Sequence, residues 1–277
     1  LVPMVKSERQ VVVGDSRQLA ASEYELLNPQ NAPILSKFGL SREDIDDNIF
    51  KRLERYLPES HVKSLSIQYR MKDEIGGLIS NCFYDGLLKS AGPKDDFGIS
   101  RIIPTVLWID TSHSQEAYEF RSSNSYSNRF EVLLVEERLK ALQSGIDKGI
   151  IKINQGYKLK VLVVCPYAAQ VQQAKTVISK LQQYSFEVEF NTIDAVQGRE
   201  ADVVIFSTVR NNSHFNSGFL SEANWRRINV ALSRARLSLI IIGSLTFWQN
   251  SNSSLSQVID YIEERESSAF GIWRSHD

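Results

Sequence analysis

The feature that most constrains this chain is an alternation of short apolar runs with amphipathic, helix-like segments. Two of the runs, residues 161–164 and 239–242, are continuously apolar, which is typical of parallel strands covered by helices on both faces. The predicted strands are Gln10–Val13, Ser64–Gln68, Thr105–Asp110, Leu159–Cys165, Glu187–Ile193, Ala201–Val209 and Ser238–Gly243. The predicted helices are Arg42–Leu57, Lys72–Tyr84, Asn128–Ser144, Ala168–Tyr184, Trp225–Arg236 and Leu255–Glu264. This order predicts an α/β fold with a doubly wound parallel sheet.

Two stretches interrupt the alternation and are predicted to be surface loops. Residues 90–103 contain Gly92 and Pro93, and residues 112–127 are rich in serine. We expect a domain boundary near Pro58, where a charged helix ends before a new strand begins. The predicted domains are therefore residues 1–58 and 59–277.

The composition is that of an ordinary globular protein, with 42% hydrophobic and 23% charged residues. The net charge is −1, so any contact with nucleic acid has to come from a local groove. Cys82 and Cys165 lie in apolar stretches and are expected to be reduced thiols, which favours a cytoplasmic or nuclear protein. No apolar run approaches the roughly 20 residues that span a bilayer, so no membrane partner is expected. The chain starts without methionine, and we expect it to begin inside a longer protein.

The first candidate motif is residues 11–19, VVVGDSRQL. The apolar run leads into Gly14 and Asp15 and places Gln18 just beyond the predicted strand. Ligands of open α/β sheets bind at that carboxyl edge. The alternative is a simple strand and turn capped by Asp15.

The second motif, residues 68–71 (QYRM), ends a predicted strand before a helix. We expect Arg70 to lie at the carboxyl edge of the sheet, with Tyr69 beside it. A planar guanidinium suits phosphate oxygens, and a tyrosine ring suits a nucleotide base. The alternative is a solvated arginine.

The third motif, residues 194–200 (DAVQGRE), joins two apolar strands. Gly198 permits a close approach of the backbone to a ligand. Gln197 and Glu200 can form hydrogen bonds with ribose or phosphate. The alternative is a polar turn with a permissive glycine.

The fourth motif, residues 226–236 (RRINVALSRAR), is predicted to be helical, with one apolar stripe. Arg227 and Arg234 are seven residues apart and would share one flank of this helix. Asn229 and Arg236 would share the other flank. Few carboxylates lie nearby in the sequence, which predicts an anionic ligand. The alternative is an ordinary solvated helix face.

Taken in order, these four motifs resemble motifs III, IV, V and VI of superfamily 1 helicases. The resemblance is to the group that includes the nonsense-decay and senataxin helicases, and it covers nearly the whole chain. It implies a RecA-like fold of the P-loop NTPase type and a motor of two lobes with ATP and Mg²⁺ between them. This chain would contribute the end of the first, N-terminal RecA-like lobe and the whole second lobe.

The resemblance also implies roles for individual residues. Gln18 would sense the γ-phosphate, Arg70 and Arg234 would be arginine fingers, Tyr69 would stack on the adenine, and Glu200 would bind the ribose. Arginine fingers contribute a factor of roughly 10³ to 10⁵ to phosphoryl transfer. The remaining nucleotide-binding candidates are Gln197, Gly198, Arg227 and Arg236.

The chain departs from the full motor pattern, because no Gly-x-x-x-x-Gly-Lys-[Ser/Thr] phosphate cradle is present. The pair Asp73 and Glu74 lies in a predicted helix and is not expected to bind magnesium. This chain alone is therefore expected not to hydrolyse ATP. Ala20 and Ala21 stand where prolines are common in the family and would alter only the local turn.

The expected partner is single-stranded or duplex nucleic acid, DNA or RNA, along which the resembled group moves 5′→3′. The predicted strand-binding residues are Pro166, Tyr167, Gln170, Ser207, Thr208 and Asn211. The alternative for Tyr167 is that it packs at a helix start. Two rival functions stay open, a non-motor nucleic-acid-binding scaffold with a helicase-like fold and a P-loop ATPase switch that is not a helicase.

Overall fold

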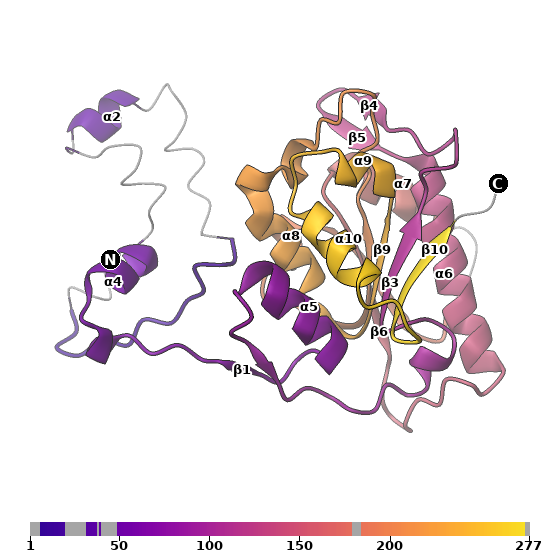
Figure 1. Cartoon of the computed structure of the whole chain (residues 1–277), viewed down its shortest axis with the longest axis horizontal. Helices are drawn as coiled ribbons and strands as arrows, with labels where there is room; N and C mark the ends of the chain where they lie inside the picture. The colour runs from indigo at the N-terminus through magenta and orange to yellow at the C-terminus, as the bar shows by residue number, and fades with distance from the viewer. Residues whose placement is uncertain (1–5, 20–31, 38, 40–48, 179–183, 275–277) are drawn as a thin grey trace. The chain divides into compact units, whose positions relative to one another are not determined.

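The computed structural model describes residues 6–19, 32–37, 39, 49–178 and 184–274 (Figure 1). The chain divides into two compact units, Leu1–Leu65 and Ser66–Asp277. None of the helices in those described ranges combines the length and the apolar character that a bilayer crossing requires.

The first unit contains short helices. They are α2 (Ala32–Lys37), α4 (Ile49–Tyr56) and the 3-10 turn η2 (Glu59–His61). The predicted strand Gln10–Val13 is wrong, because these residues form no ladder and Val11 and Val13 are exposed. A strand needs a neighbouring strand to take up its hydrogen bonds, and the described part of this unit offers none. The helix predicted at Arg42–Leu57 is confirmed from Ile49, and residues 42–48 lie outside the described residues.

The second unit is built on a parallel sheet, whose described strands have the order β10-β3-β9-β8-β6-β7. Each neighbouring pair is parallel. The strands are β3 (Val106–Asp110), β6 (Lys160–Cys165), β7 (Glu187–Thr192), β8 (Ala201–Ser207), β9 (Ala235–Gly243) and β10 (Phe270–Arg274). The chain winds from β3 out to β7 and then back to β10 at the other edge. The predicted doubly wound α/β fold is confirmed.

Helices cover both faces of this sheet (Figure 1). On one face lie α6 (Arg129–Asp147) and α7 (Ala168–Ile178), which pack on the sheet through Val135, Leu139 and Ala174. On the other lie α5 (Asp73–Phe83), α8 (Trp225–Leu232) and α10 (Leu255–Glu263), and the short α9 (Leu245–Gln249) follows β9. The two layers explain why every residue of β8 is buried, since this strand meets helices on both sides.

Several element boundaries differ from prediction. The helix predicted at Trp225–Arg236 ends at Leu232, and β9 begins at Ala235. Pairing with β8 overrides the helical pattern there, because the amide of Ala201 donates to the carbonyl of Arg234 (3.0 Å). Strand β10 was not predicted. The loop predicted at residues 112–127 contains a hairpin of β4 (Phe120–Ser122) and β5 (Ser125–Ser127).

Two connections matter for the site. The strand predicted at Ser64–Gln68 is reduced to β1 (Ile67–Gln68), which pairs with β2 (Lys89–Ser90) and not with the main sheet. The connection from β7 to β8 contains only the 3-10 turn η4 (Asp194–Val196). The third motif therefore crosses from the carboxyl end of one strand to the amino end of another without a full helix.

Candidate functional site

Arg70, Glu200, Arg234 and Arg236 lie close together at the amino ends of β8 and β9, and we call them the arginine cluster. Arg70 donates from Nε to Glu200 Oε2 (3.0 Å) and from Nη1 to the carbonyl of Ser233 (3.1 Å). These bonds join three of the four motifs, although 130 residues separate Arg70 from Glu200. The structure therefore brings together side chains that the sequence could only place on separate elements.

The prediction that Arg70 lies at the carboxyl edge of the sheet is wrong. Its segment follows β1, which is not part of the main sheet. The amide of Lys72 donates to the carbonyl of Arg236 (2.8 Å), the second residue of β9. This bond ties the segment to the amino ends of the strands instead.

Arg236 is held by a buried carboxylate. Its Nη1 donates to Asp202 Oδ1 (2.8 Å) and to the hydroxyl of Tyr157 (3.0 Å), and its Nε lies 3.8 Å from Glu200 Oε1. Asp202 also accepts from the Tyr157 hydroxyl (2.7 Å) and from the amide of Lys160 (2.9 Å). Burial opposes the charge of Arg236, but Tyr157 and Asp202 outweigh it and raise the pKa of the guanidinium.

Arg234 is inside the protein, with 1% of its surface exposed. Its guanidinium donates to the carbonyls of Val230 (2.9 Å) and Arg199 (3.2 Å) and to Ser233 Oγ (3.0 Å). These bonds stabilise the turn between α8 and β9 from the interior of the protein. The predicted finger therefore presents almost no surface to a phosphate in this conformation.

The expectation of an uncompensated arginine face is also wrong. Arg234 and Arg236 lie beyond the end of α8, so they share no helix flank with Arg227 and Asn229. Carboxylates from distant segments neutralise the arginines, because Asp202 and Glu200 face Arg236 and Asp194 Oδ1 lies 3.4 Å from Arg227 Nε.

The other predicted nucleotide-binding residues divide between two places. Tyr69 is exposed beside Arg70, and Gln197 and Gly198 are exposed in the connection that leads to Glu200. Gly198 has φ +81° and open space where a Cβ would stand, so it serves the left-handed turn, and the close approach of a ligand stays a prediction. Arg227 lies apart from the cluster, in the first turn of α8, where its Nη1 donates to Asn224 (2.7 Å).

Gln18 belongs to the first unit. Its Nε2 donates to Asp15 Oδ2 (2.8 Å), and its amide donates to the carbonyl of Asp15 (3.2 Å). Asp15 thus organises the turn, as the structural alternative for this motif expects, and also orients the Gln18 side chain.

At the opposite, carboxyl edge of the sheet, most of the predicted strand-binding residues are buried. Tyr167 is 3% exposed, and Gln170, Ser207 and Thr208 are fully buried. Gln170 Oε1 accepts from the amide of Asn128 (2.7 Å), and its Nε2 donates to the Asn128 carbonyl (3.0 Å) and to Ser207 Oγ (2.9 Å). The prediction that these four side chains contact a nucleic-acid strand directly is therefore wrong in this conformation. Pro166 and Asn211 are half-buried, and for them contact stays a prediction.

A buried carboxylate, Glu131, organises this edge. It accepts from the hydroxyl of Ser207 (2.6 Å), from the backbone amide of Val209 (2.9 Å) and from the side-chain amide of Asn128 (3.3 Å). Burial raises the pKa of Glu131 to about 7, although the bonds from Ser207 and Val209 partly offset that effect. Glu131 therefore joins the start of α6 to the end of β8.

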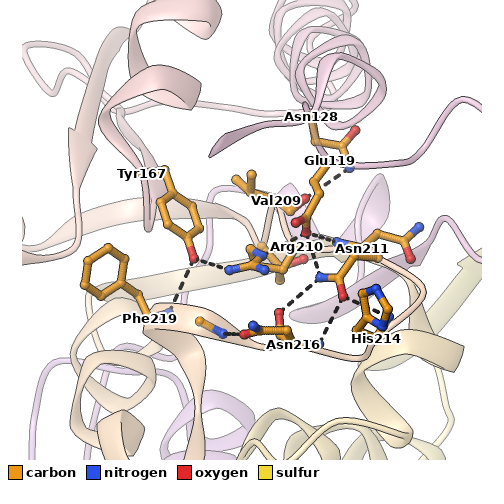
Figure 2. Close-up of polar contacts among 12 residues, drawn as sticks. Glu119, Asn128, Tyr167, Val209, Arg210, Asn211, His214, Asn216 and Phe219 are labelled. Carbon is orange, nitrogen blue, oxygen red and sulfur yellow. Dashed lines mark hydrogen bonds and ion pairs between the residues drawn. The ribbon is translucent and has the colours of Figure 1, made fainter. Parts of the chain in front are cut away.

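Figure 2 shows Arg210 between Glu119 and Tyr167. Its Nε donates to Glu119 Oε2 (2.8 Å) and its Nη1 to the Tyr167 hydroxyl (2.9 Å). Its guanidinium also lies 4.2 Å from the centroid of the Tyr126 ring. Burial disfavours the charge, but the bonds to Glu119 and Tyr167 prevail and raise the pKa of Arg210.

The sequence motifs do not include Glu119, Glu131, Asp202 or Arg210. A signal existed for two of them, because Asp202 and Arg210 are charged residues at the two ends of a run that is apolar except for Ser207 and Thr208. A charge in that position is expensive unless it is paired. Glu119 and Glu131 come from loop and helix positions where carboxylates are common, so nothing in the sequence marks them.

Comparison with known proteins gives relatives along nearly the whole chain. The helicase/nuclease dna2 of Schizosaccharomyces pombe, named as a DNA replication ATP-dependent enzyme, is 29% identical over 290 residues, which cover 96% of this chain and 19% of that protein. The DNA polymerase alpha-associated DNA helicase A of Saccharomyces cerevisiae is 27% identical over 95% of this chain and 39% of its own length. A regulator of nonsense transcripts 1 homolog of Arabidopsis thaliana is 31% identical over 88% of this chain and 18% of its own length.

The chain spans between about a fifth and two fifths of the length of these relatives. The AAA domain family matches residues 45–246, which is most of the chain and includes the second, third and fourth motifs. The chain therefore belongs to the superfamily 1 helicases, in the group of the nonsense-decay helicases.

Proposed function

We propose that this chain is the second motor lobe of an ATP-dependent nucleic-acid helicase or translocase, in which the arginine cluster meets the phosphates of ATP. The observation that carries the proposal is the convergence of Arg70, Arg236 and Glu200 in a member of this family. Guanidinium groups bind phosphate oxygens in a planar, bidentate manner. They also compensate the charge that accumulates during phosphoryl transfer.

Within the cluster, phosphate would displace the Glu200 carboxylate from the arginines. Glu200 is half-exposed and faces both Arg70 and Arg236, so phosphate oxygens would compete with its carboxylate for the same two cations. The other contacts of the arginines, to Ser233, Asp202 and Tyr157, do not depend on Glu200 and would keep the guanidinium groups in place. The released carboxylate would then accept from ribose hydroxyls.

The remaining residues take supporting roles. Tyr69 offers an exposed ring for the adenine. Arg70 is the proposed arginine finger. Arg234 is proposed as a positioning residue. It donates to the carbonyl of Arg199, the residue before Glu200, and to the hydroxyl of Ser233, whose carbonyl accepts from Arg70.

The metal and the phosphate cradle would come from the first RecA-like lobe of the same protein. Among the residues that the structure describes, no group of three or more His, Cys, Asp or Glu could hold a metal ion. We propose that residues 1–58, with Gln18, are the end of that first lobe. The 277-residue chain alone would then show negligible magnesium-dependent ATP hydrolysis, and turnover that disappears in Arg70→Ala would contradict this.

The deciding experiment measures ATP hydrolysis by the full-length protein, with magnesium and with single-stranded DNA or RNA. We expect strand-stimulated hydrolysis and 5′→3′ translocation, both lost in Arg70→Ala. Arg265→Ala is the matched control, because Arg265 lies outside the cluster and pairs with Glu264 (2.9 Å).

One observation favours a second candidate, a nucleic-acid-binding scaffold without motor activity. Two arginines of the cluster, Arg70 and Arg236, are already paired with carboxylates, as in a structural ion-pair network. Strand binding by the full-length protein without any ATP hydrolysis would establish the scaffold and contradict the motor.

A further inference from the structure

Two exposed aromatic rings lie in the loop that follows Arg210 at the carboxyl edge. Phe215 is 42% exposed and Phe219 is 49% exposed. Single exposed apolar side chains are common on protein surfaces, whereas grouped ones mark sites of contact with a partner. The helicase motifs do not account for either ring, and we call the pair the aromatic edge.

Phe219 packs against the ring of Tyr167 (Figure 2). Its centroid lies 5.4 Å from that of Tyr167, and Tyr167 in turn lies 5.2 Å from Tyr126. The Phe219 amide lies 3.4 Å from the Tyr167 hydroxyl, and the Arg227 guanidinium lies 5.5 Å from the Phe219 centroid. Buried Tyr167 cannot stack on a base, but it fixes the ring that can.

The loop holds its rings in place through its own hydrogen bonds. Asn212 Oδ1 accepts from the amides of His214 (3.2 Å) and Asn216 (3.1 Å). Phe215 has φ +50°, which is uncommon for a bulky residue and persists only where the surroundings impose it. Gly218 is required, because a Cβ there would come within 2.1 Å of Arg210 Nη1. Because the loop already holds both rings in place, little conformational entropy is lost when they bind a ligand.

The charges at this edge suit an anionic ligand. The Oε2 atom of Glu119 already accepts from Arg210, from the backbone amide of Asn211 (3.0 Å) and from the side-chain amide of Asn212 (3.0 Å). Arg121, which is exposed, is the register partner of Tyr126 in the hairpin, and Arg129, at the start of α6, is exposed as well. Exposed rings beside guanidinium groups are the chemistry that binds single-stranded nucleic acid without sequence preference.

We propose that Phe215 and Phe219 stack on the bases of a single-stranded nucleic acid, with Tyr167 and Arg210 as positioning residues behind them. The proposal rests on the proposed function, because a motor of this family needs a track, and it moves the predicted stacking contact from Tyr167 to the aromatic edge. A protein or lipid partner on the same rings is the competing outcome.

The test uses the full-length protein without ATP and two probes, a fluorescent oligothymidylate and an abasic oligomer of the same length. Phe219→Leu and Phe215→Leu keep apolar bulk and remove the stacking face. Stacking is worth about 1–3 kcal/mol per base, so each variant should lose roughly 5- to 150-fold in affinity for the oligothymidylate. Affinity for the abasic oligomer and the salt dependence should stay unchanged, since phosphate contacts are untouched.

The matched control is Trp273→Leu, which removes a partly exposed ring that also carries an arginine, Arg138, 5.4 Å from its centroid. It should bind both probes as the wild type does. Wild-type affinity of Phe219→Leu for oligothymidylate overturns the aromatic edge, and so does an equal loss on both probes. If the wild-type protein binds neither probe, the proposed nucleic-acid site is overturned. ATP hydrolysis measured without nucleic acid tests the motor function separately.

Discussion

The Arg70 guanidinium donates a 3.0 Å hydrogen bond to Glu200, and the same carboxylate lies 3.8 Å from Arg236. One acid thus faces two cations that come from different elements of the chain. An anion with several oxygens could engage both cations at once. The proposed ATP contact follows from this sharing, because the cations are already positioned before any phosphate arrives.

Arg70→Ala in the full-length protein should lower kcat for ATP hydrolysis by at least about 100-fold and change nucleotide affinity less. A finger interacts more strongly with charge in the transition state than with ground-state phosphate. Steady-state kinetics beside a direct nucleotide-binding measurement will separate the two effects. An unchanged kcat with a raised KM would show that Arg70 only binds nucleotide.

Arg234→Ala should destabilise the fold by about 3–5 kcal/mol, because the buried guanidinium serves two carbonyls and a hydroxyl that would lose their donor. Arg70→Ala should cost less than about 1 kcal/mol, since that pair is partly exposed. Denaturant unfolding of both variants measures the difference. Equal stabilities would mean that Arg234 is free to leave its internal acceptors, as a finger would.

Asp202→Asn should reduce both stability and kcat. The variant keeps the shape of the side chain but removes the charge that faces Arg236, and Asp202 is 1% exposed. We expect a loss of about 2–3 kcal/mol in the free energy of unfolding and a fall in kcat with little change in KM. Glu187→Gln is the control, because its pair with Lys158 (3.1 Å) is exposed. Similar losses in the two variants would argue against a positioning role for Asp202.

Stability should depend on pH through Glu131. Its pKa is raised from about 4.5 to about 7 in the folded protein, so the folded state keeps a proton that the unfolded state releases. The stabilisation is complete below about pH 4.5 and is lost as the pH rises to about 7. Glu131→Gln, which resembles the protonated acid, should therefore gain up to about 3 kcal/mol relative to the wild type over that interval. Parallel unfolding curves for the two proteins at every pH would contradict the raised pKa.

The fold could be predicted largely from apolar runs, because strands such as β6 and β8 are buried on both faces and show it in their composition. The failures lie where tertiary contacts decide. Arg234 and Arg236 continue a helical pattern in the sequence, yet pairing with β8 draws this segment into β9. Val11–Val13 has the composition of a strand but no strand partner among the described residues.

The candidate site was predictable as a set of residues but not as a geometry. The motifs identified Arg70, Glu200 and Arg236, which do meet. Their pairing partners could not be read, because Asp202 and Tyr157 are brought in by folding from distant positions. Tyr167 is predicted from the sequence to contact a nucleic-acid strand. Only the packing of Phe219 against it shows that Phe219, and not Tyr167, faces solvent.

The connection from β7 to β8 has a mechanical consequence. Eight residues separate Thr192 from Ala201, and three of them are wound into η4. They must span the length of β8, about 20 Å at 3.3 Å per residue, and step across β6 as well. Nine Cα-to-Cα steps reach roughly 30 Å when fully extended, and a 3-10 turn shortens that reach. Asp194 beside Arg227 and Glu200 beside Arg70 therefore lie at the two ends of a short connection that has little slack.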